Sequence, residues 1–451
     1  MNDESLDDNH LDDNHLDDNA EVKDISLRRD WMFTTGTSLV IGLVVFVTAP
    51  IAANRLGPAG RGTLVTVQLL PQILAQLASL GLGFATIHFG ARERRSVRVF
   101  WRWSLSRCAI GSLAVFALGQ LLAPVLTSNA GDQRMLRVYL LLCPLQAFVE
   151  IPYEILRALG LYRSWNGFTF LIQMIWPIAL LIGVLQPTPS LWMVVWLHLA
   201  LMLMVLVVIT FMVLRATSGR SRPPKAELSE FTSYGLKSAL STIPSSANAK
   251  LDQLVMAAFV SKPDLGLYAA AAGWSQLTLP VMRGLMAVSM PFVSGAADDE
   301  RPARAIRLIT LGLGSVLILG VGGILATLVL WGPLYGPEYK SALPAALVLM
   351  VASLLLQYNG VLSNILRSLN RPGVVTAIET GVLVLSTVAL VIALSISPVL
   401  GAAVVSFLTY SVAASIYAKE ISRNVNLPAR RLIDIGGAMS IMREVRAKFT
   451  R

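Results

Sequence analysis

Polar and basic side chains inside apolar segments could bind a substrate, and their spacing places several of them on one helix face. Lys237, Asn248 and Asp252 belong to a polar run at steps of four, four, three and four, which falls on one face of a helix. Arg283 lies near the middle of the next apolar segment, two turns after Gln276. A charge at that depth is costly, so it usually faces a cavity or a partner. The predicted substrate-binding residues are Arg283, Lys250, Asn248, Gln276 and Lys237.

Four carboxylates inside or near the ends of apolar segments could bind a coupling ion. Glu150 and Glu154 are one helical turn apart, and Arg157 follows three residues later. A carboxylate in a low-dielectric cavity can take up a proton or a sodium ion. The predicted ion-coupling residues are Asp252, Glu150, Glu154 and Glu379.

The central cation favours an anionic substrate. Phosphate and diphosphate groups are natural partners of Arg and Lys in a low-dielectric site. Other interpretations stay open at this point. The polar stripes could be hydrogen-bonding contacts between packed helices. Arg283 could form a structural ion pair with Asp252, and Glu150 or Glu154 could pair with a nearby arginine.

The elements that hold these residues are predicted to be membrane-spanning helices. Of the 451 residues, 55% are hydrophobic and 14% are charged, and the mean hydropathy is +0.63. A soluble protein could not bury so much apolar surface, and apolar runs of about 20 residues match the thickness of a bilayer. We predict an all-α polytopic membrane protein with twelve helices, six in each half, at 33–53, 64–89, 103–127, 135–157, 165–186, 190–214, 232–260, 267–295, 305–331, 342–366, 373–396 and 399–418.

The distribution of Lys and Arg predicts the orientation of these helices. With the N-terminus inside, most of the 37 basic residues fall in inner segments, and the outer loops hold only a few, among them Arg55, Arg61, Lys262 and Lys340. Both termini are therefore predicted to be cytoplasmic. The same bias accounts for the net charge of +10, so nucleic-acid binding is not needed to explain it.

Two pairs of matching motifs indicate that the halves are diverged copies. Residues 155–160 (ILRALG) match 365–370 (ILRSLN), and 56–62 (LGPAGRG) correspond to 263–268 (PDLGLY). The two pairs have similar separations, which makes chance less plausible as an explanation. Internal duplication is typical of transporters whose like halves move about a central site. The copies share one orientation in this prediction, so the repeat is parallel.

The polar segments divide the chain. A repeated Leu-Asp-Asp-Asn-His tract near the N-terminus has the charge density of a disordered segment. We predict a disordered acidic tail (1–27), an N-terminal lobe (28–214), a linker (215–230), a C-terminal lobe (231–419) and a basic tail (420–451).

Three segments resemble one transporter family. LDQLVMAAF (251–259) with DLGLY (264–268) is similar to the seventh-to-eighth helix junction of polysaccharide exporters, LYGPEYKSA (334–342) to the start of their tenth helix, and LGPAGRG (56–62) to their first loop. The chain resembles the Wzx-like O-antigen and exopolysaccharide flippases of the multidrug/oligosaccharidyl-lipid/polysaccharide exporter superfamily, over roughly residues 30–420. The resemblance implies two six-helix lobes in a V around a central cavity.

The resemblance also implies a function. It is the movement of an undecaprenyl-diphosphate-linked oligosaccharide or polysaccharide precursor across the cytoplasmic membrane of a bacterium, by alternating access. The implied partners are this lipid-linked glycan, membrane lipids, a proton or sodium ion, and glycan polymerase or export machinery. In such flippases a cationic cavity holds the diphosphate, and Arg283 is the residue best placed for that role.

Two alternatives stand beside this function. One is a drug/cation antiporter of the same superfamily, although the first span, 33–53, lacks the acidic group expected there in a drug exporter. The other is a membrane enzyme acting on lipid-linked glycans. No Walker A, Gly-x-Ser-x-Gly or HExxH motif is present, so neither an enzyme nor a cofactor is predicted. Cys108 and Cys143 lie inside predicted spans and indicate no disulfide framework or metal site.

Overall fold

The structure, a computed structural model, describes residues 13–217, 225–248, 250–294, 297 and 300–425. These residues form helices and short connections, and no strand occurs among them. The first half contains α1 (Asp13–Ala78), α2 (Leu82–Arg92), η1 (Arg94–Ser96), α3 (Val97–Leu126), α4 (Ala130–Tyr139), α5 (Leu142–Ala158), α6 (Tyr162–Val184) and α7 (Leu191–Ala216).

The second half repeats this pattern with more interruptions. It contains α8 (Lys225–Asn248), α9 (Leu251–Phe259), α10 (Lys262–Ser275), η2 (Gln276–Thr278), α11 (Leu279–Ser294), α12 (Arg301–Tyr335), η3 (Pro337–Ala342), α13 (Leu343–Ser368), α14 (Pro372–Leu394) and α15 (Pro398–Val425).

The predicted twelve-helix membrane architecture is confirmed. Nine stretches of the described chain are long and apolar enough to cross a bilayer, and one of them, Val40–Arg92, is long enough for two crossings. The broken pairs α8–α9 and α10–α11 cover the two remaining predicted spans, 232–260 and 267–295. Twelve crossings are therefore accounted for within the described residues.

The main local difference from the sequence prediction lies in α1, which continues through the predicted first loop. Gly57 adopts a non-helical conformation (φ 64°, ψ 175°), and Pro58 restarts the helix directly after it. Only glycine takes this positive φ without strain, so the chain bends without needing a loop. α1 also begins at Asp13, inside the segment predicted to be disordered. Residues 1–12 of that segment lie outside the described residues.

The repeated Ile-Leu-Arg motifs end two helices in the same way. Gly160 after α5 and Asn370 after α13 both have positive φ, 77° and 60°. The next backbone N–H donates back to the carbonyl of Leu156 at 2.9 Å, and in the second copy to Leu366 at 3.0 Å. These bonds are those of a Schellman C-cap, which favours Gly or Asn at the left-handed position. The motif is thus a helix-stop signal present in both halves.

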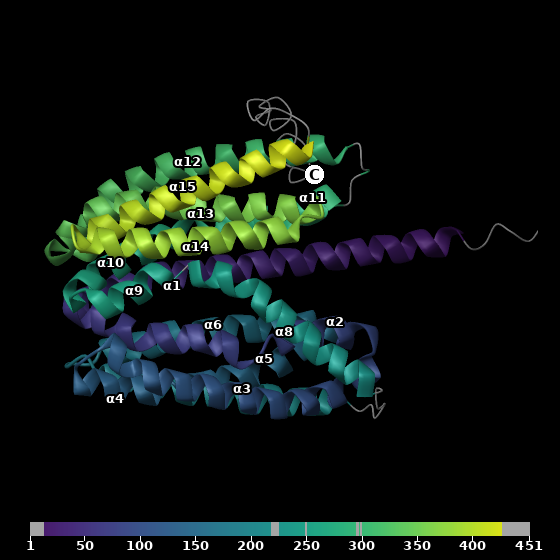
Figure 1. The fold of residues 1–451 in the computed structure, drawn as a ribbon. Helices are drawn as coiled ribbons and strands as arrows, with labels where there is room; N and C mark the ends of the chain where they lie inside the picture. The colour runs from purple at the N-terminus through teal and green to yellow at the C-terminus, as the bar shows by residue number, and fades with distance from the viewer. Residues whose placement is uncertain (1–12, 218–224, 249, 295–296, 298–299, 426–451) are drawn as a thin grey trace, which may run out of the picture.

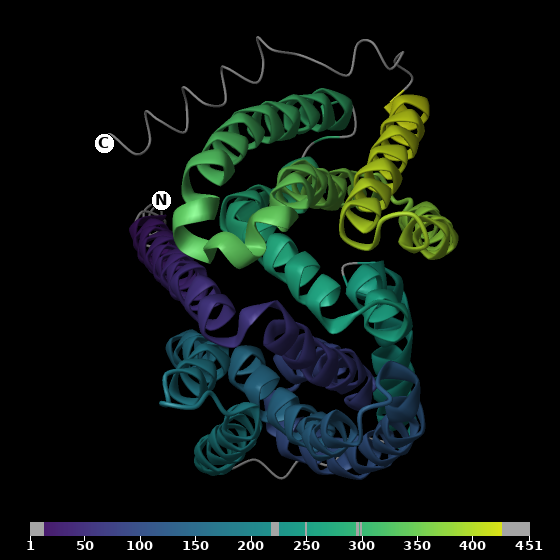
Figure 2. The ribbon, with the colours of Figure 1, turned by 90° about the vertical axis from the view of Figure 1, so that its left-hand side faces the viewer.

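The helices form two layers (Figure 1). One layer holds α2–α7 and the other α10–α15, and α1 runs between them in contact with both α6 and α10. α8 starts beside α2 in the first layer and leads into the second half. Viewed onto the end where the layers meet, α1 crosses the centre of the molecule (Figure 2). The space between the layers is therefore bordered by elements of both halves.

Candidate substrate cavity

A cavity of about 590 Å³ lies between the two layers. Its walls come from α1 and α6 on one side and from α9, α10, η2, α11, α13 and α15 on the other. Four charged residues line it among the described residues: Arg61, Lys250, Asp252 and Arg283. Three are basic and one is acidic, so the cavity suits an anion better than a cation.

Lys250 lines the cavity at the point where the predicted seventh span is interrupted. α8 ends at Asn248, and Lys250 is the N-cap residue of α9 with non-helical φ and ψ of −136° and 0°. Its Nζ donates to Oε1 of Gln72 on α1 at 2.6 Å. This bond joins the two halves across the cavity. Discontinuous helices of this kind are tolerated where they line a polar site.

Asp252 lines the cavity but already has protein partners. The Tyr268 hydroxyl donates to its carboxylate, and the Gln253 backbone N–H donates to Oδ1 at 2.7 Å. Asp252 also lies in the first turn of α9, where a negative charge is favourable. Among the ion pairs of the described residues, none joins Asp252 to Arg283.

Arg283 and Gln276 lie on the other wall, and both side chains are exposed to the cavity. Gln276 opens the 3₁₀ turn between α10 and α11, and Arg283 lies on α11 two turns later. The nearby buried Gln357 exchanges hydrogen bonds with Thr278 at 3.3–3.5 Å. The Gln357 amide is therefore already hydrogen-bonded within the protein. The exposed guanidinium of Arg283 is the cation that α11 presents to the cavity.

Arg61 is a cavity residue that the sequence analysis placed in an outer loop. Because α1 resumes directly after Gly57, Arg61 lies on a helix and faces the cavity near Tyr335 and Tyr339. Its Nε is buried and has no hydrogen-bond partner among the described residues. Gln72 is eleven residues further on, so Arg61 and Lys250 are separated by about 16 Å along the helix. A Gly-Pro-Ala-Gly stretch normally indicates a turn, and no other signal in the sequence marked this arginine.

The predicted single polar face from Lys237 to Asp252 is wrong. α8 ends at Asn248 and α9 begins only at Leu251, so Lys237 and Asn248 belong to α8 and Asp252 belongs to α9. Lys237 is exposed and is not among the residues that line the cavity. The side chains of Ser241 and Ser245, which complete that stripe, lie outside the described residues. Residues spaced three or four apart share a helix face only where the helix is continuous.

Asn248 instead lines a second, smaller pocket of about 110 Å³ together with Glu379 and Asn359. The amide nitrogens of both asparagines donate to backbone carbonyls, Asn248 to Glu379 and Asn359 to Tyr410, each at 3.0 Å. Their Oδ1 atoms are buried and have no hydrogen-bond donor among the described residues. The Glu379 carboxylate lies 3.8 Å from Arg367. α8, α13, α14 and α15 therefore bring two unpaired amide oxygens and one carboxylate to the same pocket.

Glu150 and Glu154 lie in the other layer, on α5. Oε1 of Glu150 lies against α2 so closely that a Cβ on Gly83 would be 2.5 Å from it. Glu154 forms an ion pair with Arg157 at 3.8 Å. Neither residue lines the cavity or the second pocket. The structure thus separates the four predicted ion-coupling residues into three places.

The cavity is closed at one end by contacts between the halves. Tyr339 donates to the Ala53 carbonyl at 3.2 Å, and Nδ2 of Asn54 donates to the Leu334 carbonyl at 2.6 Å. Lys262 forms an ion pair with Asp132. The repeated segments 56–62 and 263–268 meet here. A Cβ on Gly62 would lie 1.9 Å from the Lys262 carbonyl oxygen, so the backbones touch directly.

A protein-family comparison identifies most of this chain. Residues 56–341 match the family model described as "Polysaccharide biosynthesis protein". No curated protein matches the chain.

Solved structures with the same fold include two kinds of membrane transporter. One is "Lipid II flippase MurJ, inward closed conformation", with a TM-score of 0.72, 10% identity, and coverage of 90% of each chain. Another is an inward-facing "multidrug resistance MATE family transporter of the MOP superfamily", with a TM-score of 0.65, 15% identity, and coverage of 86% of this chain and 98% of that one. An outward-facing MATE structure has a TM-score of 0.57, 16% identity, and coverage of 88% and 95%. The two-lobed exporter fold is therefore shared.

Proposed function

The chain belongs to the polysaccharide biosynthesis protein family, and from this membership we propose that it flips a lipid-linked, diphosphate-bearing oligosaccharide across the cytoplasmic membrane. Membrane flippases and exporters share its fold, and its described helices suit a multi-pass membrane protein. The finer assignment concerns the substrate, and it rests on the chemistry of the central cavity.

The observation that carries the proposal is the charge of that cavity. Arg61, Lys250 and Arg283 line it together with a single carboxylate, and Tyr268 already donates to that carboxylate. A diphosphate brings the complementary negative charge and several acceptor oxygens. A drug/cation antiporter, the alternative, needs an unoccupied acid to attract its cargo. The excess of basic groups weighs against that alternative.

The closed end supports alternating access with the cavity facing the cytoplasm. Arg55, Arg61, Lys262 and Lys340, the basic residues of predicted outer loops, belong to the elements that meet at this end. By the positive-inside rule, this sparsely charged end faces outward. The inward conformations named for the MurJ and MATE structures fit the same orientation. The diphosphate would bind at Arg283 and Lys250, and opening at Arg61 would release it.

Reconstitution tests this function directly. Vesicles with the purified full-length protein should move an undecaprenyl-diphosphate-linked oligosaccharide between leaflets faster than protein-free vesicles. The measurement is the fraction of glycan that an added, membrane-impermeant periodate reagent can oxidise over time. Vesicles with heat-inactivated protein are the control. If the flipping rate with active protein equals that of the heat-inactivated control, and the same vesicles transport a cationic dye, the antiporter would be favoured.

We further propose that the second pocket binds the coupling cation. Carboxylate and amide oxygens are the ligands that hard cations prefer, and the pocket offers Glu379 with the free Oδ1 atoms of Asn248 and Asn359. The hydrogen bonds of the two amide nitrogens orient those oxygens. Tyr410 joins this pocket to the central cavity, because it lines both and donates to the Asn248 carbonyl at 3.2 Å. A change in the second pocket on ion binding would therefore be transmitted to the substrate site through α8 and α15.

Replacing Glu379 with glutamine should uncouple transport from the ion gradient. Glu379 is the only carboxylate among the described residues that line the pocket, so its loss should weaken cation binding by at least about 10-fold. Glycan flipping would be measured in vesicles under an imposed sodium gradient and, separately, a pH gradient. Glu420→Gln is the control, because Glu420 pairs with Arg423 at 2.8 Å outside the pocket. If Glu379→Gln responds to both gradients as the unaltered protein does, the pocket is not the coupling site.

A further inference from the structure

An apolar groove outside the cavity lies on the side of the first layer. It has a volume of about 580 Å³. α5 packs against both α3 and α7 and places Phe148 between them. Trp101 and Leu105 of α3 line one wall, and the 206–214 face of α7 lines the other. None of the lining residues is charged. Val207 and Phe211 are 61% and 53% exposed, so the groove opens outward.

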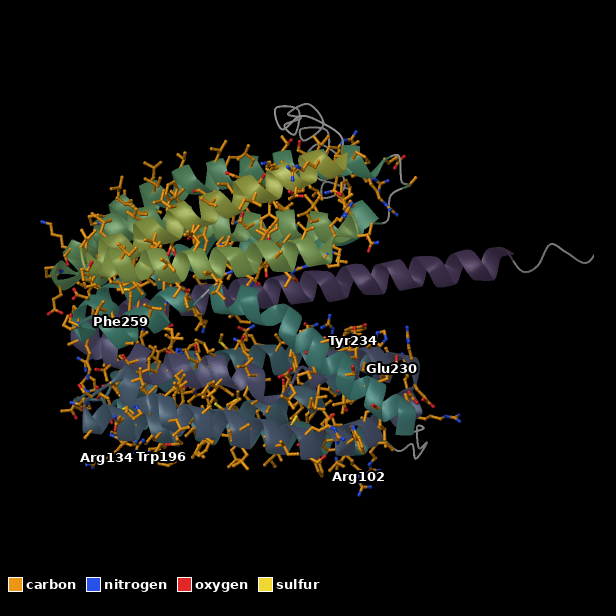
Figure 3. All side chains as sticks on the ribbon, in the orientation of Figure 1. Arg102, Arg134, Trp196, Glu230, Tyr234 and Phe259 are labelled. Atoms are coloured by element: carbon orange, nitrogen blue, oxygen red, sulfur yellow. The ribbon has the colours of Figure 1, made fainter. Side chains whose placement is uncertain are left out.

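Basic side chains lie at one end of this groove. The Arg215 guanidinium stacks over the ring of Phe211, a lining residue, with 4.1 Å between Cζ and the ring centroid. On the facing wall, the exposed Arg102 directly follows Trp101, and Arg98 lies one turn earlier. Arg102 lies near one end of the layer and Arg134 near the other (Figure 3). The groove is therefore amphipathic along its length, apolar inside with cations at the end where α3 begins and α7 ends.

Trp101 provides an independent sign of a ligand. The residue is only 6% exposed and lines the groove. Its indole N–H is buried and has no hydrogen-bond partner among the described residues. A buried donor without a partner is costly, so native proteins usually satisfy it with protein, water or ligand. An acceptor oxygen held at the basic end of the groove would satisfy this one.

We propose that this groove binds one glycerophospholipid with an anionic headgroup. One acyl chain fills the apolar hollow, because hydrocarbon is the available filler on the lipid-facing side of a membrane protein. The phosphate accepts hydrogen bonds from Arg102 and Arg215, as basic groups at the headgroup level do for anionic lipids, and an oxygen of the headgroup or ester accepts from Trp101. The site shares no lining residue with the central cavity, so it is independent of the proposed substrate site.

The test uses the full-length protein in a neutral maltoside detergent, titrated with phosphatidylglycerol or with phosphatidylcholine carrying the same chains. Native mass spectrometry counts retained lipids, and melting temperature reports stabilisation. One phosphatidylglycerol should be retained in preference to phosphatidylcholine. The Arg102→Gln/Arg215→Gln variant should bind it about 25-fold more weakly, about fivefold for each charge. Trp101→Phe, which keeps the ring but removes the N–H donor, should lose about fivefold.

Arg134→Gln/Arg137→Gln on α4 is the matched control, with the same charge change at the opposite end of the layer. It should retain the lipid as the unaltered protein does. Equal lipid-free melting temperatures across the variants will show that none is misfolded. Equal retention of the two lipids, or unchanged retention by the Arg102/Arg215 variant, would overturn the proposal. Displacement of phosphatidylglycerol by added undecaprenyl phosphate would also overturn it, because the groove would then hold a polyprenyl chain.

Discussion

Arg283→Gln should strongly reduce glycan transport while leaving the protein folded and at normal abundance. The side chain is exposed to the cavity and makes no ion pair with Asp252, so its loss removes little from the folded state. Its loss does remove the exposed cation of the α11 wall. A charge-assisted hydrogen bond contributes about 1.5–3 kcal/mol, so substrate binding should weaken by about 10- to 150-fold. The measurement is the flipping rate in vesicles, together with surface glycan in cells that carry only the variant.

Two further variants make this result specific. Arg283→Lys keeps the charge but loses the bidentate geometry, so it should retain partial activity. Arg107→Gln removes an equal charge from α3, where the guanidinium stacks on Trp103 at 3.4 Å outside the cavity. That control should transport normally. Full transport by Arg283→Gln would remove this residue from the substrate site and leave Lys250 and Arg61 as the candidates.

Gly266→Ala should prevent the two halves from closing at the end where they now meet. A Cβ on Gly266 would lie 1.9 Å from the Pro58 carbonyl oxygen and 2.9 Å from the Gly62 nitrogen. No flexible side chain can move aside there, because both neighbours are backbone atoms. Overpacking costs about 1–3 kcal/mol or more, which would shift the closed population by at least 5- to 150-fold. The transport rate should fall as the closed population falls, since alternating access requires each end to close in turn.

Spin labels at Arg134 on α4 and Lys340 on η3 would measure this change. Both positions are exposed, and they belong to opposite halves. The distance distribution between the labels should move to longer values in Gly266→Ala. Gly273→Ala is the matched control on the same helix, because nothing lies within 4 Å of the added carbon. An unchanged distribution in Gly266→Ala would show that the glycine contact does not hold this end closed.

Several parts of the site were predictable because each rests on a local property. Arg283 and Gln276 stand out because a mid-membrane charge and a polar neighbour two turns away are visible in any apolar run. Lys250 stood out for the same reason. The structure brings these three to one cavity with Asp252. Their assignment to substrate binding stays a prediction that the variants above would test.

Other parts depend on where a helix breaks, which the spacing of residues did not reveal. The stripe from Lys237 to Asp252 is regular in sequence, yet α8 ends at Asn248 and α9 begins at Leu251, and Asp252 lines the central cavity whereas Asn248 does not. Arg61 lies beside glycines and a proline that usually form a loop. Gly57 absorbs the bend in one residue, and the helix carries Arg61 into the cavity instead.

The membrane class, the twelve crossings and the family could be predicted from the sequence, because hydrophobic runs of bilayer length and short motifs are local signals. The repeated Ile-Leu-Arg motif also indicated where two apolar segments end, and α5 and α13 end at that motif. Which polar groups share a pocket depends on how the helices pack against one another. Asn248, Asn359 and Glu379 come from three different helices, and Arg61 and Lys250 line one cavity from opposite halves of the chain. Such pairings follow from the packing of whole helices, and no periodicity within one helix encodes them.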